Sequence, residues 1–553
     1  MNLSLSDYLI FALYGLSTIA LGLWVSRRKS GRQRSAEDYF LAGKSLPWWA
    51  IGASLIAANI SAEQFIGMSG SGFAIGLAMA SYEWMGAVAL LVVGKYFLPI
   101  YLREKLYSIP EFLEKRYGTN IKSILALFWI AVFIFVNLTS VLYLGAMALD
   151  TVMGTGDGSL VMISIIGLAL FAAAYSLWGG LSAVAWTDVL QVVLLVAGGL
   201  VTTCIGLDKL SGGEGIFAGF RTLWENVGHE KFSMVLSPGE NIMPGGRDAY
   251  MDLPGLSVLL GGLWIANLYY FGFNQYIIQR TLAAKNIGEA QKGMVFAAGL
   301  KMIIPFLVII PGMIAFAMYN SGMFDTATAF SATDGTVDAD RAYPWLVSHF
   351  VPPGLKGLVL AALAAAIVSS LASMINSTAT IFTMDIYKPY FNRNASDRTT
   401  VNVGRIAAVA SLVIACCVAP VLGNFGQAFQ YIQEYTGIVT PGILSIFLLG
   451  LFWRKTTNNA AIWGALMSII FGIFFKLACN NGILPPMPWM RQVEFTFLLT
   501  VAVIVAISLI EGRGKDSPKA IGLGKRLFHT TSSFNIPALA VLILLTAIYV
   551  IFW

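Results

Sequence analysis

The sequence has little charge and few of the side chains that carry metal or redox chemistry. Charged residues make up 12% of the 553 residues, which is about half their share in an ordinary soluble domain. The four cysteines include no CxxC pair, and the three histidines (His229, His349 and His529) lie far apart. These absences argue against a disulfide framework, a zinc site and a nucleophilic triad, so we do not expect an enzyme. The net charge of +6 is small for this length and predicts no nucleic-acid partner.

The sequence is instead rich in long apolar runs. Apolar residues make up 57% of the chain, and the mean hydropathy is +0.74. A soluble protein of this size needs a larger charged surface, so we expect the apolar surplus to face lipid. We predict an all-α integral membrane protein with about fourteen transmembrane helices, each near the ~20 residues that a bilayer requires. The predicted spans are 5–26, 47–71, 80–101, 123–149, 159–178, 186–207, 252–277, 293–319, 353–384, 402–422, 427–453, 459–478, 491–510 and 532–552.

Basic residues favour one side of these predicted spans. Arg27, Arg28, Lys29, Arg32 and Arg34 follow the first span, and the positive-inside rule places that loop in the cytoplasm. Later loops on the same side also carry cations: Arg103, Lys105, Lys115, Arg116, Arg280, Lys285, Lys292, Lys388, Arg393, Arg398, Arg454, Lys455, Arg513, Lys515, Lys519, Lys525 and Arg526. The alternation predicts that both termini lie outside the cell, together with the two long loops 208–251 and 320–352.

Two spans contain polar runs where a membrane helix would be apolar. The second span carries polar groups within 57–64, and the seventh within 267–275. The two spans lie five apart, so they cross the membrane in opposite directions. Two five-helix repeats of inverted topology, each opening with a broken helix, produce this pattern. We predict such a core over 47–453, made of repeats 47–207 and 252–453. The first helix and a basic loop (1–46) precede it, and three C-terminal helices (454–553) follow.

Several ionisable or amide side chains fall within the predicted spans. They are Glu63, Gln64, Glu83, Asp188, Lys301, Gln433 and Glu434. A charge at the bilayer centre costs about 2.5–3.5 kcal/mol on insertion scales, so such groups are paired or face a water-filled path. They either line a functional site or form buried pairs that only hold helices together.

Ser369 and Ser370 lie next to each other in the ninth span. A serine in a membrane helix commonly returns its hydroxyl to a carbonyl three or four residues back. If these serines face a broken helix with free carbonyls, they and the Ala366 carbonyl complete a cage of about five oxygens, which suits a hard cation. Near the second break, one aromatic of the run 269–271 could cover the apolar face of a pyranose ring.

Long motifs along the chain resemble the solute:sodium symporter family. They lie at 38–49, 58–65, 179–188, 279–285 and 430–437, and the resemblance covers nearly the whole chain. It implies a leucine-transporter-type fold with fourteen helices and alternating access. It also implies a sodium site formed by the carbonyls of Ala57, Ile60 and Ala366 and the hydroxyls of Ser369 and Ser370.

The resemblance further implies a sugar site with gates on both sides. Its sugar-binding residues are Asn59, Gln64, Glu83, Asn267, Lys301 and Gln433. The inner gate is Tyr270, and the outer gates are Met68, Tyr82 and Phe429. Asp188 lies on the route by which sodium leaves. Two positions depart from the family pattern, because Gly86 stands where a serine is expected and Phe271 where a tryptophan is expected.

We therefore expect a symporter that uses sodium to bring a neutral monosaccharide, of the galactose or glucose type, into the cell. Its expected partners are the sugar, the sodium ion and the lipid bilayer of a bacterial inner membrane, with no obligate protein partner. One alternative keeps sodium coupling and changes the solute to myo-inositol, a sialic acid or an amino acid. Another is a sensor or channel of the same fold that does not transport.

Overall fold

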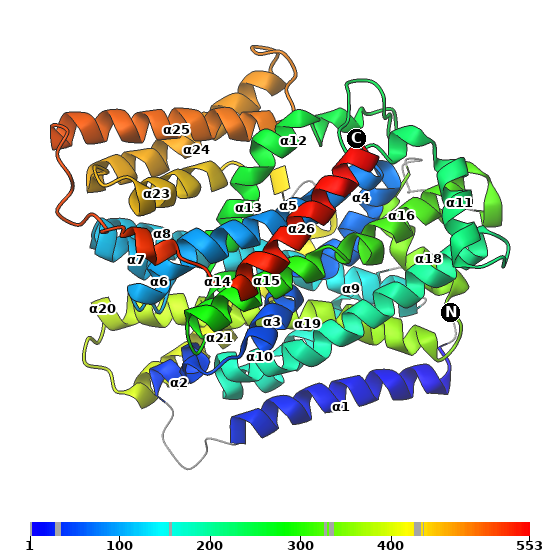
Figure 1. The fold of residues 1–553 in the computed structure, drawn as a ribbon. Helices are drawn as coiled ribbons and strands as arrows, with labels where there is room; N and C mark the ends of the chain where they lie inside the picture. The colour runs from blue at the N-terminus through cyan, green and yellow to red at the C-terminus, as the bar shows by residue number, and fades with distance from the viewer. Residues whose placement is uncertain are drawn as a thin grey trace.

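The described part of the chain is almost entirely helical. The computed structural model describes residues 3–27, 35–153, 158–325, 329–330, 337–424, 433–434 and 436–553. These residues contain no strand, although isolated bridges join Leu46 to Ala284 and Ile242 to Asp248. Within them, ten helices are long and apolar enough to cross a membrane, or eleven if the bent pair Ala249–Leu260 and Gly262–Phe273 counts as one span. The prediction of an all-α membrane protein is confirmed at this level (Figure 1).

The helices follow the apolar runs of the sequence. The longer ones are α1 (Leu5–Arg27), α3 (Trp48–Asn59), α5 (Ser81–Val92), α7 (Ile109–Arg116), α8 (Thr119–Val132), α9 (Thr139–Met153), α10 (Val161–Leu210), α11 (Ile216–Val227), α13 (Gly262–Phe273), α14 (Gln275–Leu282), α15 (Ile287–Lys301), α16 (Ile304–Asn320), α18 (Ala342–Phe350), α19 (Leu355–Ile381), α21 (Asp397–Val418), α23 (Thr440–Phe452), α24 (Asn458–Asn480), α25 (Trp489–Gly512) and α26 (Ser532–Ile551). Shorter ones are α2 (Ala36–Phe40), α4 (Ser69–Ala74), α6 (Leu98–Arg103), α12 (Leu256–Leu260) and α20 (Lys388–Tyr390).

Helix α10 is a helical hairpin rather than a straight rod. Gly180 inside it has φ 58° and ψ −154°, a conformation that is essentially restricted to glycine. The ring of Tyr14 on α1 packs against Phe171, with ring centroids 5.8 Å apart, and its hydroxyl accepts a hydrogen bond from Gln191 at 3.4 Å. A straight helix would separate those two partners by about 30 Å. The chain therefore reverses at Gly180, and the two arms correspond to the predicted spans 159–178 and 186–207.

Two helices are interrupted at the polar runs. Between α3 and α4 the backbone is extended at Ile60 (φ −89°, ψ 118°), and between α13 and α14 it is extended at Asn274 (φ −82°, ψ 120°). The two breaks thus have nearly the same geometry. Leu46, before α3, pairs with Ala284, after α14. The start of the first broken helix lies beside the end of the second, so the two run in opposite directions.

Polar groups freed by the breaks find partners within the protein. At the first break the Ser61 amide donates to Gln64 Oε1 at 2.8 Å. At the second, the Tyr101 hydroxyl donates to the Gly272 carbonyl at 3.0 Å. Lipid offers no such partners, so an interrupted helix is stable in a membrane only where side chains or water supply them.

Two of the cations assigned to loops lie in helices and are buried. Arg116 on α7 donates from Nε to the Gly450 carbonyl at 2.9 Å and from Nη2 to the Trp453 carbonyl at 3.1 Å. It thereby satisfies carbonyls at the end of α23, which have no partners within that helix. Arg280 on α14 is fully buried. The prediction that Arg116 and Arg280 lie in loops is therefore wrong. The charge of a residue does not distinguish a cation that caps a helix, or one in a buried ion pair, from a cation exposed to solvent. The basic residues at 28, 29, 32 and 34 lie outside the described part of the chain.

The two chain ends lie on the side of the molecule that carries α11 and α18 (Figure 1). Asp7 in α1 accepts hydrogen bonds from the amides of Gly354 and Gly357 at the start of α19. Near the other end, the Phe552 carbonyl accepts from the Met234 amide at 2.6 Å. In the same loop region, the Lys231 ammonium donates to the Ala74 carbonyl at the end of α4. Burial lowers the pKa of Lys231 to about 8, although Glu230 acts to raise it.

The hairpin in α10 can be tested with Gly180→Ala. A Cβ at Gly180 would lie 2.3 Å from the Tyr39 carbonyl oxygen, and the backbone conformation alone makes a residue other than glycine about 1–3 kcal/mol less stable. We expect the variant to lower the midpoint of thermal unfolding in detergent by several degrees. Gly167→Ala is the matched control on the same helix, because a Cβ there meets nothing within 4 Å. Equal midpoints for the two variants would contradict the hairpin.

Candidate functional site

A cavity of about 110 Å³ lies between the two broken helices. Its polar lining comes from both breaks, from α5, α15 and α19, from the segment between α8 and α9, and from the start of α23 and the residues before it. The polar residues that line it are Asn59, Ser61, Glu63, Gln64, Glu83, Asn137, Asn267, Asn274, Lys301, Ser370, Gln433, Thr436 and Thr440. The structure thus brings all six residues predicted to bind a sugar to one cavity, although they are spread over more than 370 positions of the chain.

A buried ion pair forms part of the wall. The Lys301 ammonium on α15 lies 2.5 Å from Glu83 Oε2 on α5, and the two side chains are 1% and 4% exposed. The pair gives this wall no net charge. Burying either charge alone would be far more costly than burying the pair. The same ammonium lies 5.0 Å from the centre of the Phe271 ring, which is within the range of a cation–π contact.

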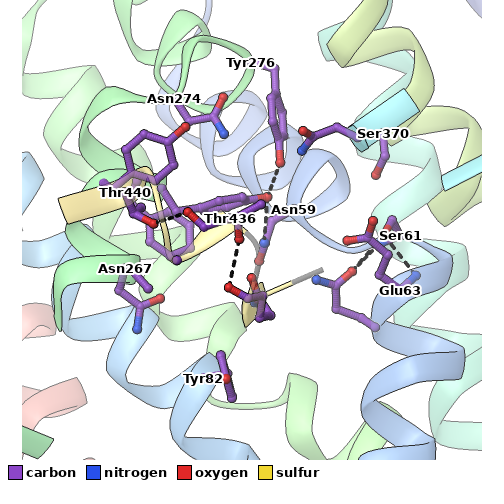
Figure 2. A pocket seen from close by; sticks show the side chains of 18 of the residues that line it. Asn59, Ser61, Glu63, Tyr82, Asn267, Asn274, Tyr276, Ser370, Thr436 and Thr440 are labelled. Carbon is purple, nitrogen blue, oxygen red and sulfur yellow. Dashed lines mark hydrogen bonds between the residues drawn. The ribbon is translucent and has the colours of Figure 1, made fainter. Parts of the chain in front are cut away.

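Four amide side chains around the cavity have unsatisfied atoms. Asn59 Oδ1, Asn137 Oδ1, Asn267 Nδ2 and Asn274 Oδ1 are buried and have no hydrogen-bond partner among the described residues. Figure 2 shows Asn59, Asn267 and Asn274 placed around the cavity. A buried polar atom without a partner costs about 1–3 kcal/mol, so such atoms mark positions where a ligand or water completes the bonding. These four amides therefore offer three acceptors and one donor to a polar solute.

Tyr270, the predicted inner gate, joins the two broken helices. Its hydroxyl accepts from Asn59 Nδ2 at 3.1 Å and from the Tyr276 hydroxyl at 2.6 Å, and Figure 2 shows the side chains of Asn59 and Tyr276 converging on this point. Of the predicted outer gates, Tyr82 lines the cavity. Met68 is fully buried and does not belong to the lining. Phe429 lies outside the described residues.

The two serines predicted to bind sodium point to different partners. The Ser370 hydroxyl bridges α19 to the first break, donating to the carbonyls of Ala58 at 3.2 Å and Ile60 at 3.3 Å. The Ser369 hydroxyl donates to Asp188 Oδ1 at 2.6 Å. Ile60 and Ser370 are therefore in contact. The other two residues whose carbonyls were predicted to bind sodium, Ala57 and Ala366, are fully buried. The Ala58 carbonyl was not among the predicted sodium ligands.

Asp188 belongs to a second buried charge cluster. Its carboxylate accepts hydrogen bonds from Ser54 and Ser369 and pairs with Arg280 Nη2 at 3.3 Å. Arg280 Nε also donates to the Ser54 carbonyl at 3.1 Å, and its Nη2 donates to Ser373. The cluster fastens α3, α10, α14 and α19 to one another. The sequence placed Asp188 near the sodium route but did not identify Arg280 as its partner.

Several residues of the cavity were not predicted as site residues. They are Ser61, Glu63, Asn137, Asn274, Tyr276, Thr436, Thr440 and Trp489. Asn274 and Tyr276 flank the second break, so their polarity beside that break was a usable signal. Glu63 accepts from the Ser140 hydroxyl at 2.5 Å. No feature of the sequence marked Trp489 as a site residue, because it begins α25, which was assigned to the flanking C-terminal helices.

The chain resembles known proteins over its full length. A family model described as the sodium:solute symporter family matches residues 39–468. A Vibrio parahaemolyticus protein named sodium/glucose cotransporter is 56% identical, with 100% of this chain and 99% of that relative covered. A Mus musculus protein named sodium/myo-inositol cotransporter 2 is 34% identical, with 85% of this chain and 69% of that relative covered.

A solved structure resembles the chain in fold. It is a substrate-bound, outward-open Na⁺-coupled sialic acid symporter, with a TM-score of 0.76 over 92% of this chain and 98% of that one. The sequences are 22% identical, so the likeness bears on the fold alone.

The Asp188–Arg280 pair can be tested by removing each charge in turn. Asp188→Asn or Arg280→Met leaves an uncompensated buried charge, so each is expected to reduce stability by about 3–5 kcal/mol, and the double variant by less than the sum. The measurement is thermal or denaturant unfolding in detergent. Arg341→Gln is the control, because it breaks an exposed pair with Asp338 that is worth about 0–1 kcal/mol. Additive losses in the double variant would contradict the pairing.

Proposed function

The chain belongs to the sodium:solute symporter family, and we propose that it couples sodium entry to the uptake of a neutral monosaccharide of the glucose or galactose type. The prediction that the chain is a membrane transporter and not an enzyme agrees with this membership. The unsatisfied amide atoms, in a cavity whose Lys301 is already paired with Glu83, are the observation that carries the proposal. A sugar hydroxyl both donates and accepts, so a polyol can satisfy Asn59, Asn267 and Asn274 together.

The choice among solutes rests on charge and on similarity. An anionic solute such as a sialic acid favours an unpaired cation, whereas Lys301 is already paired with Glu83 at 2.5 Å. Myo-inositol, a neutral polyol, is the second candidate, and a relative at 34% identity carries that name. The relative named for glucose is 56% identical over the whole chain, which favours a hexose. In this proposal Gln64 and Gln433 complete the set of hydroxyl partners.

The proposed sodium ion binds between the first break and α19. Its ligands are the carbonyls of Ala57, Ile60 and Ala366 and the hydroxyls of Ser369 and Ser370, all oxygens of the kind that hard cations prefer. The hydrogen bond from the Ser370 hydroxyl to the Ile60 carbonyl supports the site. It holds two of the proposed ligand oxygens together, and both could bind a sodium ion in place of this bond. Asp188 then lies next to Ser369 on the path by which sodium leaves toward the cytoplasm.

The proposed architecture has about fourteen crossings with an inverted-repeat core of the leucine-transporter type. Ten helices pass the length and hydropathy test. The second arm of α10, the broken helix α3–α4, the bent pair α12–α13 and the short apolar α23 bring the number to about fourteen spans of the length a bilayer requires. The antiparallel broken helices support repeats at 47–207 and 252–453. The segment 1–46 and the helices of 454–553 flank this core.

The proposed location is a bacterial inner membrane with both termini outside the cell. The Vibrio relative supports a bacterial membrane, and the shared side of the two chain ends supports their common orientation. Loops with many cations then face the cytoplasm, as the positive-inside rule requires.

Coupling follows from the position of the first break. Sodium fixes the end of α3 against α19, and Asn59 and Gln64 beside that break are then held in the orientation that meets the solute. When sodium leaves, the break loosens and Tyr270 can part from Asn59. One charge crossing 100 mV supplies about 2.3 kcal/mol, whereas a tenfold solute gradient requires about 1.4 kcal/mol. One sodium therefore supports more than tenfold accumulation from voltage alone.

The test is uptake into proteoliposomes across a panel of labelled solutes, with an inward sodium gradient or with potassium in its place. The panel contains glucose, galactose, myo-inositol, a sialic acid and an amino acid. We expect sodium-dependent uptake of a hexose. Uptake that is equal in potassium would contradict sodium coupling, and sodium-dependent uptake of only a charged solute would contradict the assigned solute class.

The same assay locates the sodium site through Ser370→Ala. This change removes the hydroxyl that bridges α19 to the break, so we expect the sodium concentration for half-maximal uptake to rise about tenfold, or 1.4 kcal/mol. Thr378→Val on the same helix is the control, because the Thr378 hydroxyl bonds only its own helix, at the Met374 carbonyl. Unchanged sodium activation in Ser370→Ala would place the sodium elsewhere.

A further inference from the structure

We propose, on the basis of the proposed sugar transport, that Gly86 and Phe271 act as a matched pair that sets the position of the Lys301 ammonium and thereby selects the solute. Gly86 is buried on α5, one turn after Glu83, so the two residues lie on the same face of that helix. Gly86 does not itself line the cavity, whereas Phe271 and Lys301 do. Its effect on a solute must therefore pass through these two neighbours.

The space beside Gly86 is filled by its two partners. A Cβ at this position would lie 3.0 Å from Cε2 of Phe271 and 3.3 Å and 3.4 Å from Cε and Cδ of Lys301. The first two separations are tighter than ordinary van der Waals contact, so a side chain at position 86 would shift the ring or the lysine stem by a few tenths of an ångström. Interiors packed this closely transmit such displacements rather than absorbing them. The absence of a side chain at Gly86 is thus what allows Phe271 to lie against Lys301.

The Phe271 ring limits what the ammonium can offer to a solute. An ammonium has three N–H donors. One side of it meets Glu83 at 2.5 Å, and another faces the Phe271 ring, whose centre is 5.0 Å away. The third N–H can then donate to one solute hydroxyl. Glu83 and the Phe271 ring together therefore fix how many donors Lys301 offers to the solute and in which direction they point.

The same ring also contacts the inner gate. The rings of Tyr270 and Phe271 meet edge to face with centroids 5.0 Å apart at 79°. A displacement of Phe271 therefore reaches Tyr270 as well as Lys301. Position 86 is in this way linked to both the solute wall and the gate, without touching the solute.

The test is a double-variant cycle on sugar uptake and binding. Gly86→Ser adds bulk where the ring lies, so we expect the KM for the best sugar to rise about tenfold, on the scale of the overpacking penalty, and the ratio of KM values among epimers to change. Phe271→Leu removes the ring edge, so Gly86→Ser combined with Phe271→Leu is expected to recover part of the loss. Sodium affinity measured without sugar is expected to stay within twofold of the native protein. Gly299→Ala on α15 is the control, because a Cβ there meets nothing within 4 Å.

Two results would overturn the pairing. One is a KM and an epimer ranking for Gly86→Ser that match those of Gly299→Ala. The other is a double variant whose fold-increase in KM equals the product of the fold-increases in the two single variants. If Gly86→Ser does not fold, Phe271→Leu alone decides the matter, since it adds no bulk and an unchanged epimer ranking contradicts the proposal. Native uptake that needs no sodium or excludes sugars would instead contradict the proposed function, so the two failures are distinguishable.

Discussion

The structure depends on satisfying the backbone polar groups that a broken helix exposes inside a membrane. At Ile60 the chain leaves the helical conformation, and the carbonyls at the end of α3 lose their partners within the helix. The Ser370 hydroxyl, from a helix more than 300 positions away, now bonds two of those carbonyls. A break in lipid is stable only with such partners. The need for them makes this point a natural site for a cation, and it ties the state of α3 to the state of α19.

Two buried ion pairs lie near this point and join four helices of the core. Glu83 and Lys301 join α5 to α15 at the cavity, and Asp188 and Arg280 join α10 to α14 beside Ser369. A buried pair is strongly disfavoured once its partners separate, so each pair restricts the motions that the helices can make. The cavity lies next to the first pair, and the proposed cation site lies next to the second. Contacts connect α3 to both pairs. Ser54 bonds Asp188 and Arg280, and Asn59 bonds Tyr270, whose ring packs against Phe271 beside Lys301.

Local patterns in the sequence predicted the parts of this arrangement that depend on local physics. Apolar runs predicted the helices, and polar residues around Asn59 and Asn274 predicted the two breaks. The resemblance to a known family then assigned six residues to one sugar site, and all six line the cavity. The sequence did not reveal the partner of Asp188, since Arg280 lies 92 positions away and looked like a loop cation. Nor did it reveal that the Phe271 ring lies beside the position that a Cβ at Gly86 would take, because both residues stood out only as departures from a pattern. Such contacts depend on how distant helices pack, which neither hydropathy nor spacing encodes.

We propose that sodium at the first break organises the solute cavity. The decisive measurement is sugar affinity in sodium and in potassium, and sodium affinity with and without sugar, on the purified protein. Thermodynamic linkage requires the two ratios to be equal, and coupling between sites is typically about 5–150-fold. We predict that sodium and sugar each raise the affinity for the other by the same factor within this range. Sugar affinity that is identical in sodium and potassium would contradict it.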